Sequence, residues 1–141
     1  MKTKIIIATT LMLLISAMGL AYSDNAARKD KDAEYARKGQ KLFMQYCASC
    51  HGGDAKGQGP VAIALKGGPR DLTLLQAPDK NFQFYQVQAW IEGEQEVSAH
   101  GTRKMPVWGT ILRRAVGDLE KQADIYALVK YIESIQQHGK K

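Results

Sequence analysis

The sequence predicts an all-α domain with long connecting loops. Helices are expected near both ends of the domain, at about residues 32–46 and 117–136, and a third at about residues 79–92. The C-terminal segment carries apolar residues at steps of three and four, which is the period of one helix face. No segment alternates apolar and polar residues over the length of a strand, so no sheet is expected.

Residues 1–23 are expected to be a signal peptide. Two lysines lie among the first four residues, an apolar run follows over residues 5–20, and small residues lead up to Ser23. Cleavage after Ser23 is predicted, and the alternative is that the run stays uncut as a membrane anchor. Residues 24–141 then form one exported domain, which export from a bacterial cell would place in the periplasm.

The first helix is preceded by a polar stretch. Residues 24–31 are charged and are expected to be a frayed lead-in. Acidic residues near the start of the helix at residues 32–46 favour its dipole. Residues 52–68 are rich in glycine and lysine and are expected to form a loop, with one helical turn near residues 61–65.

A glycine in the first helix predicts a close helix crossing. Gly39 and Phe43 lie four residues apart, on one helix face. A glycine in a helix interior costs about 1 kcal/mol relative to alanine, so a tight contact is expected to compensate for it. Leu128 and Tyr131 of the C-terminal helix are the predicted partners.

The chemistry of the chain is concentrated in the motif Cys47-x-x-Cys50-His51. This spacing is the attachment signature of a c-type haem, in which two thiols bond to vinyl groups and the histidine binds the iron. A thioredoxin-like pair would follow a strand, and a zinc site would need further ligands although the chain has no other cysteine. A structural disulfide across two residues would be strained. One covalently bound haem c is therefore predicted.

Met105 is the predicted second axial ligand of the iron. Pro106 restricts the residue before it to extended conformations, and a stiff loop of this kind can hold a thioether over a haem face. His100 is the rival, since imidazole binds iron more strongly than a thioether does. Met44 is expected in the core and His138 in solvent. Two strong ligands favour an electron carrier, whereas an iron with one protein ligand is a catalyst or a gas site.

The charge of the chain bears on its partners. The net charge is +6, and it falls to about +4 if the two leader lysines are removed. No basic run with interleaved aromatics is present, so nucleic-acid binding is not expected. A basic rim around the haem is predicted to steer acidic partners, with an ordinary solvated surface as the alternative. Its candidate residues are Lys56, Lys66, Arg70, Lys80, Arg103, Lys104, Arg113 and Arg114.

The sequence resembles the class I cytochromes c, the small monohaem family with His and Met ligands. Within this family it is most similar to the bacterial members. The resemblance rests on Gly39 with Phe43, the haem motif with Gly52, Gly59-Pro60, Met105-Pro106, and Leu128 with Tyr131. It implies the class I fold, in which the N- and C-terminal helices cross beside one covalent haem. It also implies that the carbonyl of Pro60 accepts the Nδ1 proton of His51 and orients the ring.

These observations together predict an electron carrier and not an enzyme. We expect single-electron transfer between redox proteins that present acidic docking surfaces, and contact with a membrane only if the leader is retained. Two alternatives stay open. The first is an electron-transfer subunit of a larger oxidoreductase complex. The second is a haem catalyst or gas sensor with a labile distal ligand.

Overall fold

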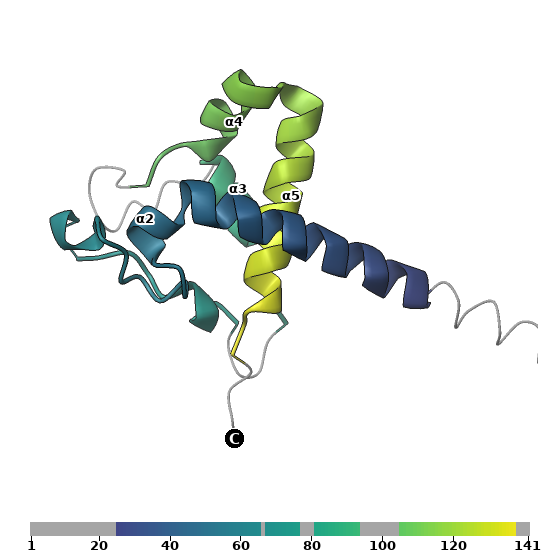
Figure 1. Ribbon diagram of the computed structural model, residues 1–141, viewed down its shortest axis with the longest axis horizontal. Helices are drawn as coiled ribbons and strands as arrows, with labels where there is room; N and C mark the ends of the chain where they lie inside the picture. The colour runs from purple at the N-terminus through teal and green to yellow at the C-terminus, as the bar shows by residue number, and fades with distance from the viewer. Residues whose placement is uncertain (1–24, 66, 77–80, 94–104, 138–141) are drawn as a thin grey trace, which may run out of the picture. The chain divides into compact units, whose positions relative to one another are not determined.

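The computed structural model describes most of the predicted domain (Figure 1). The described residues are 25–65, 67–76, 81–93 and 105–137. The chain divides into two compact units, residues 1–34 and 35–141. Of the first unit, residues 25–34 are described and are helical. The contacts reported below all lie within the second unit.

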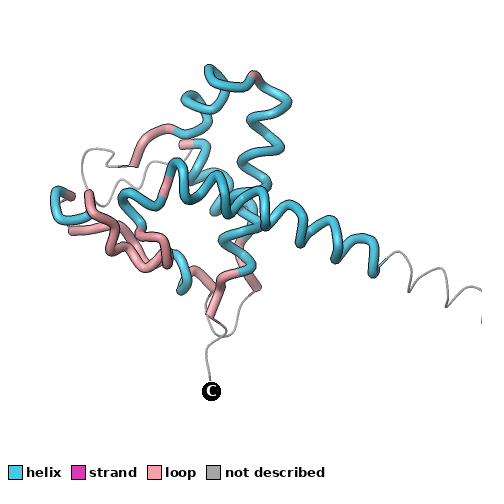
Figure 2. The backbone as a smooth tube through the Cα atoms, viewed as in Figure 1, coloured by secondary structure: helices cyan, strands magenta, loops and turns pink. Residues whose placement is uncertain are grey.

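The described part of the chain is all-α and contains no strand (Figure 2). Its elements are α1 (residues 25–46), α2 (Ala48–His51), the short 3-10 helices η1 (Ala62–Ala64) and η2 (Leu72–Leu74), α3 (Phe84–Glu92), α4 (Trp108–Val116) and α5 (Asp118–Ser134). The all-α fold predicted from the sequence is therefore confirmed.

Helices α1 and α5 cross in direct contact (Figure 1). Gly39 lies at the crossing: a Cβ there would overlap the backbone carbonyl of Ala127 and would lie 2.9 Å from Cβ of Tyr131. The ring of Phe43 lies 5.2 Å from that of Tyr131, and Leu128 belongs to the same buried cluster. The predicted packing of Gly39 and Phe43 against α5 is confirmed. The closest approach is to the backbone of Ala127, which the apolar pattern did not indicate.

Polar and aromatic contacts extend this crossing along α1. The ammonium of Lys38 lies 2.7 Å from Oδ1 of Asp124, whose side chain is 7% exposed. One turn earlier, the rings of Tyr35 and Tyr126 form a T-shaped pair with 4.9 Å between their centroids. An ammonium beside a buried carboxylate compensates a charge that would otherwise be costly to bury.

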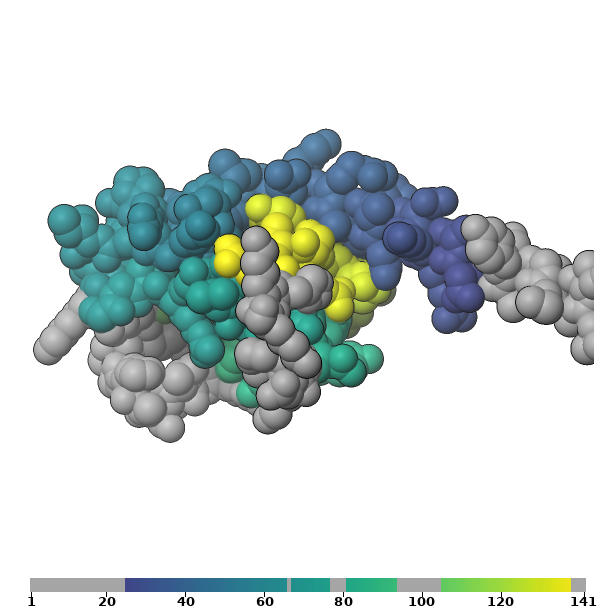
Figure 3. Space-filling view, turned by 90° about the horizontal axis from the view of Figure 1, so that it is seen from below, coloured from purple at the N-terminus to yellow at the C-terminus, as the bar shows by residue number. Residues whose placement is uncertain are grey.

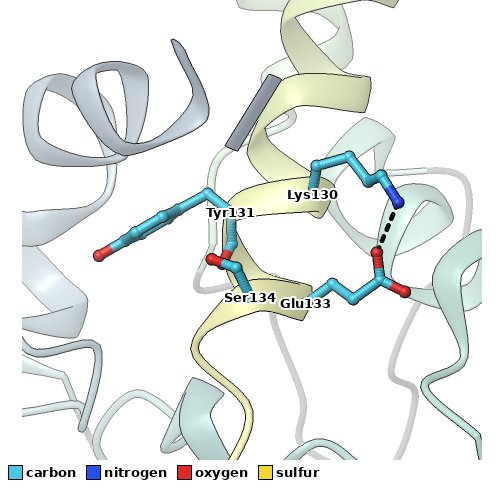
Figure 4. Close-up of polar contacts among 4 residues, drawn as sticks. All are labelled: Lys130, Tyr131, Glu133 and Ser134. Atoms are coloured by element: carbon cyan, nitrogen blue, oxygen red, sulfur yellow. Dashed lines mark hydrogen bonds and ion pairs between the residues drawn. The ribbon is translucent and has the colours of Figure 1, made fainter. Parts of the chain in front are cut away.

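Helices α3 and α4 pack on α5 and on each other. The buried face of α3 contributes Val87 and Ile91, and α4 contributes Leu112. Phe84 lies on the same face of α3 and packs against this core, and the ammonium of Lys130 lies 5.8 Å from the centre of its ring. The same ammonium forms an ion pair with Glu133 at 2.9 Å (Figure 4). Helix α5 is therefore the element against which α1, α3 and α4 all pack.

The helix bounds differ from the predicted ones in three places. Residues 25–31 are helical and not frayed, because alanines and long charged side chains are strong helix formers. Helix α3 begins at Phe84, and residues 77–80 lie outside the described part. Helix α4 was not predicted. Its first turn contains Gly109, which is a poor helix former but lies against the backbone of Glu92.

Two further expectations concern surfaces. Met44 was expected in the core, but it is 54% exposed, so that expectation is wrong. Among the residues that the structure describes, no helix has both the length and the apolar character needed to cross a bilayer. The predicted leader, residues 1–23, lies outside this part of the chain.

Candidate functional site

The haem motif begins directly after α1. Cys47 separates α1 from α2, and its N–H donates to the carbonyl of Phe43 at 2.8 Å. The N–H of His51 donates in turn to the carbonyl of Cys47 at 2.9 Å. Since Phe43 is fully buried against α5, the packing of α1 sets the position of the motif. Cys47, Cys50 and His51 thus lie on one short turn held by the helix crossing.

Both cysteines are free thiols and are half-buried. Burial, followed by the neighbouring Cys50, raises the pKa of Cys47 to about 12. At neutral pH this thiol is therefore protonated, and a protonated thiol is a poor nucleophile for disulfide exchange. The side chain of Cys47 also packs against the core cluster of the domain.

The imidazole of His51 is held by a backbone carbonyl. Its Nδ1 lies 3.2 Å from the carbonyl oxygen of Arg70. A carbonyl only accepts hydrogen bonds, so Nδ1 carries the proton and the lone pair of Nε2 remains available. Burial lowers the pKa of His51, and the hydrogen bond to Arg70 opposes that shift. The neutral ring that results is the form that binds a metal.

This contact corrects the expectation for Pro60. The carbonyl of Pro60 was expected at Nδ1 of His51, and the carbonyl of Arg70 lies there instead. The reason is local. The N–H groups of Gly59 and Val61 donate to the carbonyls of Cys50 and Ser49, at 3.0 and 2.9 Å, so the residues flanking Pro60 are bound to the backbone of the motif.

The segment before η2 reaches the imidazole because it crosses the loop after the motif. Gly57 has φ of 81°, and a Cβ on it would overlap the carbonyl of Pro69. The N–H of Leu72 donates to the carbonyl of Ala55 at 2.8 Å. Two close backbone contacts therefore flank Arg70. The sequence signals for this crossing are Gly57 and Pro69, and neither indicates the partner by itself.

Met105 is the first residue of the last described segment. Its side chain is half-buried and packs on the core cluster that Cys47 also contacts. Pro106 and Val107 follow outside any helix, as expected, and α4 begins at Trp108. The ring of Trp108 lies 5.5 Å from that of Tyr46, which immediately precedes the motif. The rival ligand, His100, lies outside the described residues.

The predicted basic rim is described in part. Lys56, Arg70, Arg113 and Arg114 are exposed. Arg113 forms an exposed ion pair with Asp118, with 3.7 Å between Nε and Oδ1. The other candidates, Lys66, Lys80, Arg103 and Lys104, lie outside the described residues, as does His138.

The donor set fits a covalently attached haem. Two free thiols separated by two residues can each form a thioether, and the next residue presents a neutral imidazole whose Nε2 has a free lone pair. The exposure of Cys47, Cys50 and His51 is intermediate, so all three are both anchored and accessible.

Comparison with known proteins gives one result. The protein-family model described as "Cytochrome c" matches residues 36–136, which is most of the chain. Comparison with curated proteins and with solved structures finds no match.

Proposed function

Since the chain belongs to the cytochrome c family, whose domains imply a c-type haem electron carrier, we propose that it is an exported monohaem carrier of single electrons. The observation that carries the proposal is the donor set of one turn, in which two free cysteines precede an imidazole oriented by the Arg70 carbonyl. A bound haem supplies an iron that changes its charge by one electron.

The residues of the motif hold the cofactor in this proposal. Cys47 and Cys50 would form the two thioether bonds, and Nε2 of His51 would bind the iron. The carbonyl of Arg70 accepts the Nδ1 proton, which fixes the plane of the ring and makes the imidazole a stronger electron donor.

Met105 would supply a second ligand to the iron. Its sulfur is on a non-helical segment that is stiffened by Pro106 and joined to α4, which packs on α5, so the thioether is presented with little freedom. A thioether favours the ferrous state more than a second imidazole would, and two permanent ligands leave no open position for a substrate.

Optical spectra of the matured protein test the ligand pair. Covalent haem, low-spin iron in both oxidation states and a sulfur-to-iron charge-transfer band are expected. Met105→Ala is expected to abolish that band while the haem stays attached. If the band survives this substitution, the ligand assignment is overturned. Rapid binding of carbon monoxide and a high-spin ferric spectrum would instead favour the catalyst or gas sensor.

Export is the second part of the proposal. The leader ends in small residues after an apolar run, and covalent haem attachment in bacteria takes place outside the cytoplasmic membrane. The mass of the mature protein tests it. A chain that begins at Asp24 is expected, and a chain that retains residues 1–23 would show the uncleaved anchor.

The partners are proposed to be redox proteins with acidic docking surfaces. Lys56, Arg70, Arg113 and Arg114 are exposed, and the chain is basic as a whole. Gel filtration of the protein purified from its source separates a free carrier from a subunit. A monomer that elutes alone supports the carrier, and co-elution with an oxidoreductase would favour the subunit of a complex.

A further inference from the structure

The carboxamide of Gln136 joins the end of α5 to the segment around η2. Gln136 is buried, with 7% of its surface exposed. Its Oε1 accepts hydrogen bonds from the N–H groups of Leu75 and Gln76, each at 2.9 Å. Its Nε2 donates to the carbonyls of Leu72 and Ile132, each at 2.7 Å.

These four bonds use both donors and both acceptor sites of the amide. Only one orientation of the amide can form them, because two N–H groups face one end and two carbonyls face the other. A buried partner left without its bond would cost free energy, so the four bonds hold the segment firmly. The backbone adds one more bond, from the N–H of Gln137 to the carbonyl of Thr73 at 2.9 Å.

The two segments therefore lie side by side although they are distant in sequence. In Figure 3 the yellow atoms of the C-terminal residues lie directly beside the teal atoms of the η2 region. Leu75 and Gln136 are separated by 61 residues along the chain. Within the described residues, Gln136 forms three of its four side-chain hydrogen bonds with this segment.

The same segment carries the carbonyl that contacts the imidazole. Arg70 precedes Leu72 by two residues, and its carbonyl lies 3.2 Å from Nδ1 of His51. The N–H of Leu72 donates to the carbonyl of Ala55, in the loop that follows the motif. The position of the Arg70 carbonyl thus depends on how firmly residues 72–76 are held to α5.

We propose that Gln136 is a positioning residue for the His51 imidazole, because it holds the η2 segment so that the Arg70 carbonyl stays in contact with Nδ1. The inference rests on the proposed function, in which His51 binds the iron. An imidazole whose Nδ1 proton is bonded to a carbonyl donates more electron density to its metal, which favours the ferric state. Loss of the Gln136 bonds should therefore raise the reduction potential.

The test is Gln136→Met in the full-length, matured holoprotein. Methionine has a similar length but forms none of the four bonds. At a fixed solution potential the ferrous-to-ferric ratio is expected to rise roughly tenfold, which is about 59 mV for a one-electron couple. Exchange of the His51 Nδ1 proton with solvent, followed by NMR, is expected to become faster.

Two control variants separate positioning from stability. Ser134→Ala removes a hydrogen bond from Oγ to the carbonyl of Tyr131, 2.7 Å long, at the same end of α5, and both partners of this bond belong to α5 (Figure 4). Lys38→Met weakens the crossing of α1 and α5 elsewhere. Both are expected to leave the ratio and the proton exchange unchanged. If they shift the potential as Gln136→Met does, the effect is general destabilisation and the inference is overturned.

Gln136→Asn covers the case in which Gln136→Met yields no holoprotein. Asparagine keeps the amide but is one methylene shorter, so it cannot reach all four partners, and a shift in the same direction is expected. If wild-type NMR spectra show that His51 is not an iron ligand, the proposed function fails and the inference fails with it. If His51 is a ligand and the variant that folds leaves the potential unmoved, only the inference is overturned.

Discussion

Gly39 allows the close contact between α1 and α5 because it has no side chain. The carbonyl of Ala127 occupies the position that a Cβ would take, and that carbonyl belongs to the backbone of α5. A backbone cannot turn aside as a flexible side chain can, so the helices themselves would have to separate.

Gly39→Ala is therefore expected to destabilise the holoprotein by about 3 kcal/mol, despite the higher helix propensity of alanine. Guanidinium denaturation measures the loss. Gly53→Ala is the matched control, because its Cβ would meet only Met44, at an ordinary 3.5 Å. Equal stability of the two variants would contradict the close crossing.

At the scale of elements, Lys38 and Asp124 join α1 to α5 by charge. The carboxylate is 7% exposed and the ammonium 43%, so loss of the lysine leaves the more deeply buried partner alone. Lys38→Met is expected to cost about 2 kcal/mol of unfolding free energy. When Asp124→Asn is added to Lys38→Met, part of the lost unfolding free energy should be recovered, because the unpaired buried charge is removed. If Lys38→Met alone were as stable as the wild type, water would be compensating the buried charge of Asp124 in place of the lysine.

The start of η2 carries a second charge-dependent contact. Asp71 accepts hydrogen bonds from the hydroxyl of Thr73 at 2.7 Å and from its N–H at 2.8 Å. The pKa of Asp71 lies below its usual 3.8, mainly because of the hydrogen bond from the Thr73 hydroxyl. Burial raises the pKa, whereas the N–H of Thr73 and the charge of Lys56 also lower it. A lowered pKa in the folded state stabilises the protein above the unfolded value, and that contribution is lost as the pH falls through the folded one.

Thr73→Val should therefore destabilise the protein more at neutral pH than in acid. Denaturation at about pH 7 and about pH 3 measures the difference from the wild type, which should shrink toward the lower pH. Thr73→Ser keeps the hydroxyl and should keep the pH dependence. A difference that does not change with pH would show that valine acts through packing alone.

At the scale of the whole molecule, the basic charge should govern how fast partners meet. Electron transfer with an acidic partner is expected to slow as salt shortens the screening length from about 30 Å at 0.01 M to about 3 Å at 1 M. Stopped-flow kinetics over this range measures the effect, and an uncharged small-molecule reductant is the control. Rates with the protein partner that do not depend on salt would exclude steering by charge.

The parts of the fold that follow from the sequence are those with local causes. The period of the apolar residues indicated α5, and Gly39 with Phe43 indicated the crossing, because helix faces repeat every three to four residues. Helix α4 was missed because Pro106 and Gly109 suggest a loop. It is stabilised by burial of Leu112 and by the contact of Gly109 with α3, and neither is visible in the local sequence.

The candidate site divides in the same way. The motif Cys47-x-x-Cys50-His51 is contiguous, so its spacing alone predicted the cofactor, and the family match over residues 36–136 agrees with it. The carbonyl beside His51 comes from a residue 19 positions later, and the sequence analysis assigned it to Pro60 instead. Every residue has a carbonyl, so side-chain patterns carry no signal for which one will be used.

The sequence by itself determined the all-α class, the family and the haem motif, since each depends on residue type and spacing within one segment. Only the tertiary structure decided that Arg70 orients His51 and that Gln136 holds the intervening segment to α5. Both are contacts between backbone groups and distant residues. They join residues that lie 19 and 61 positions apart, so they form only when the chain folds back on itself.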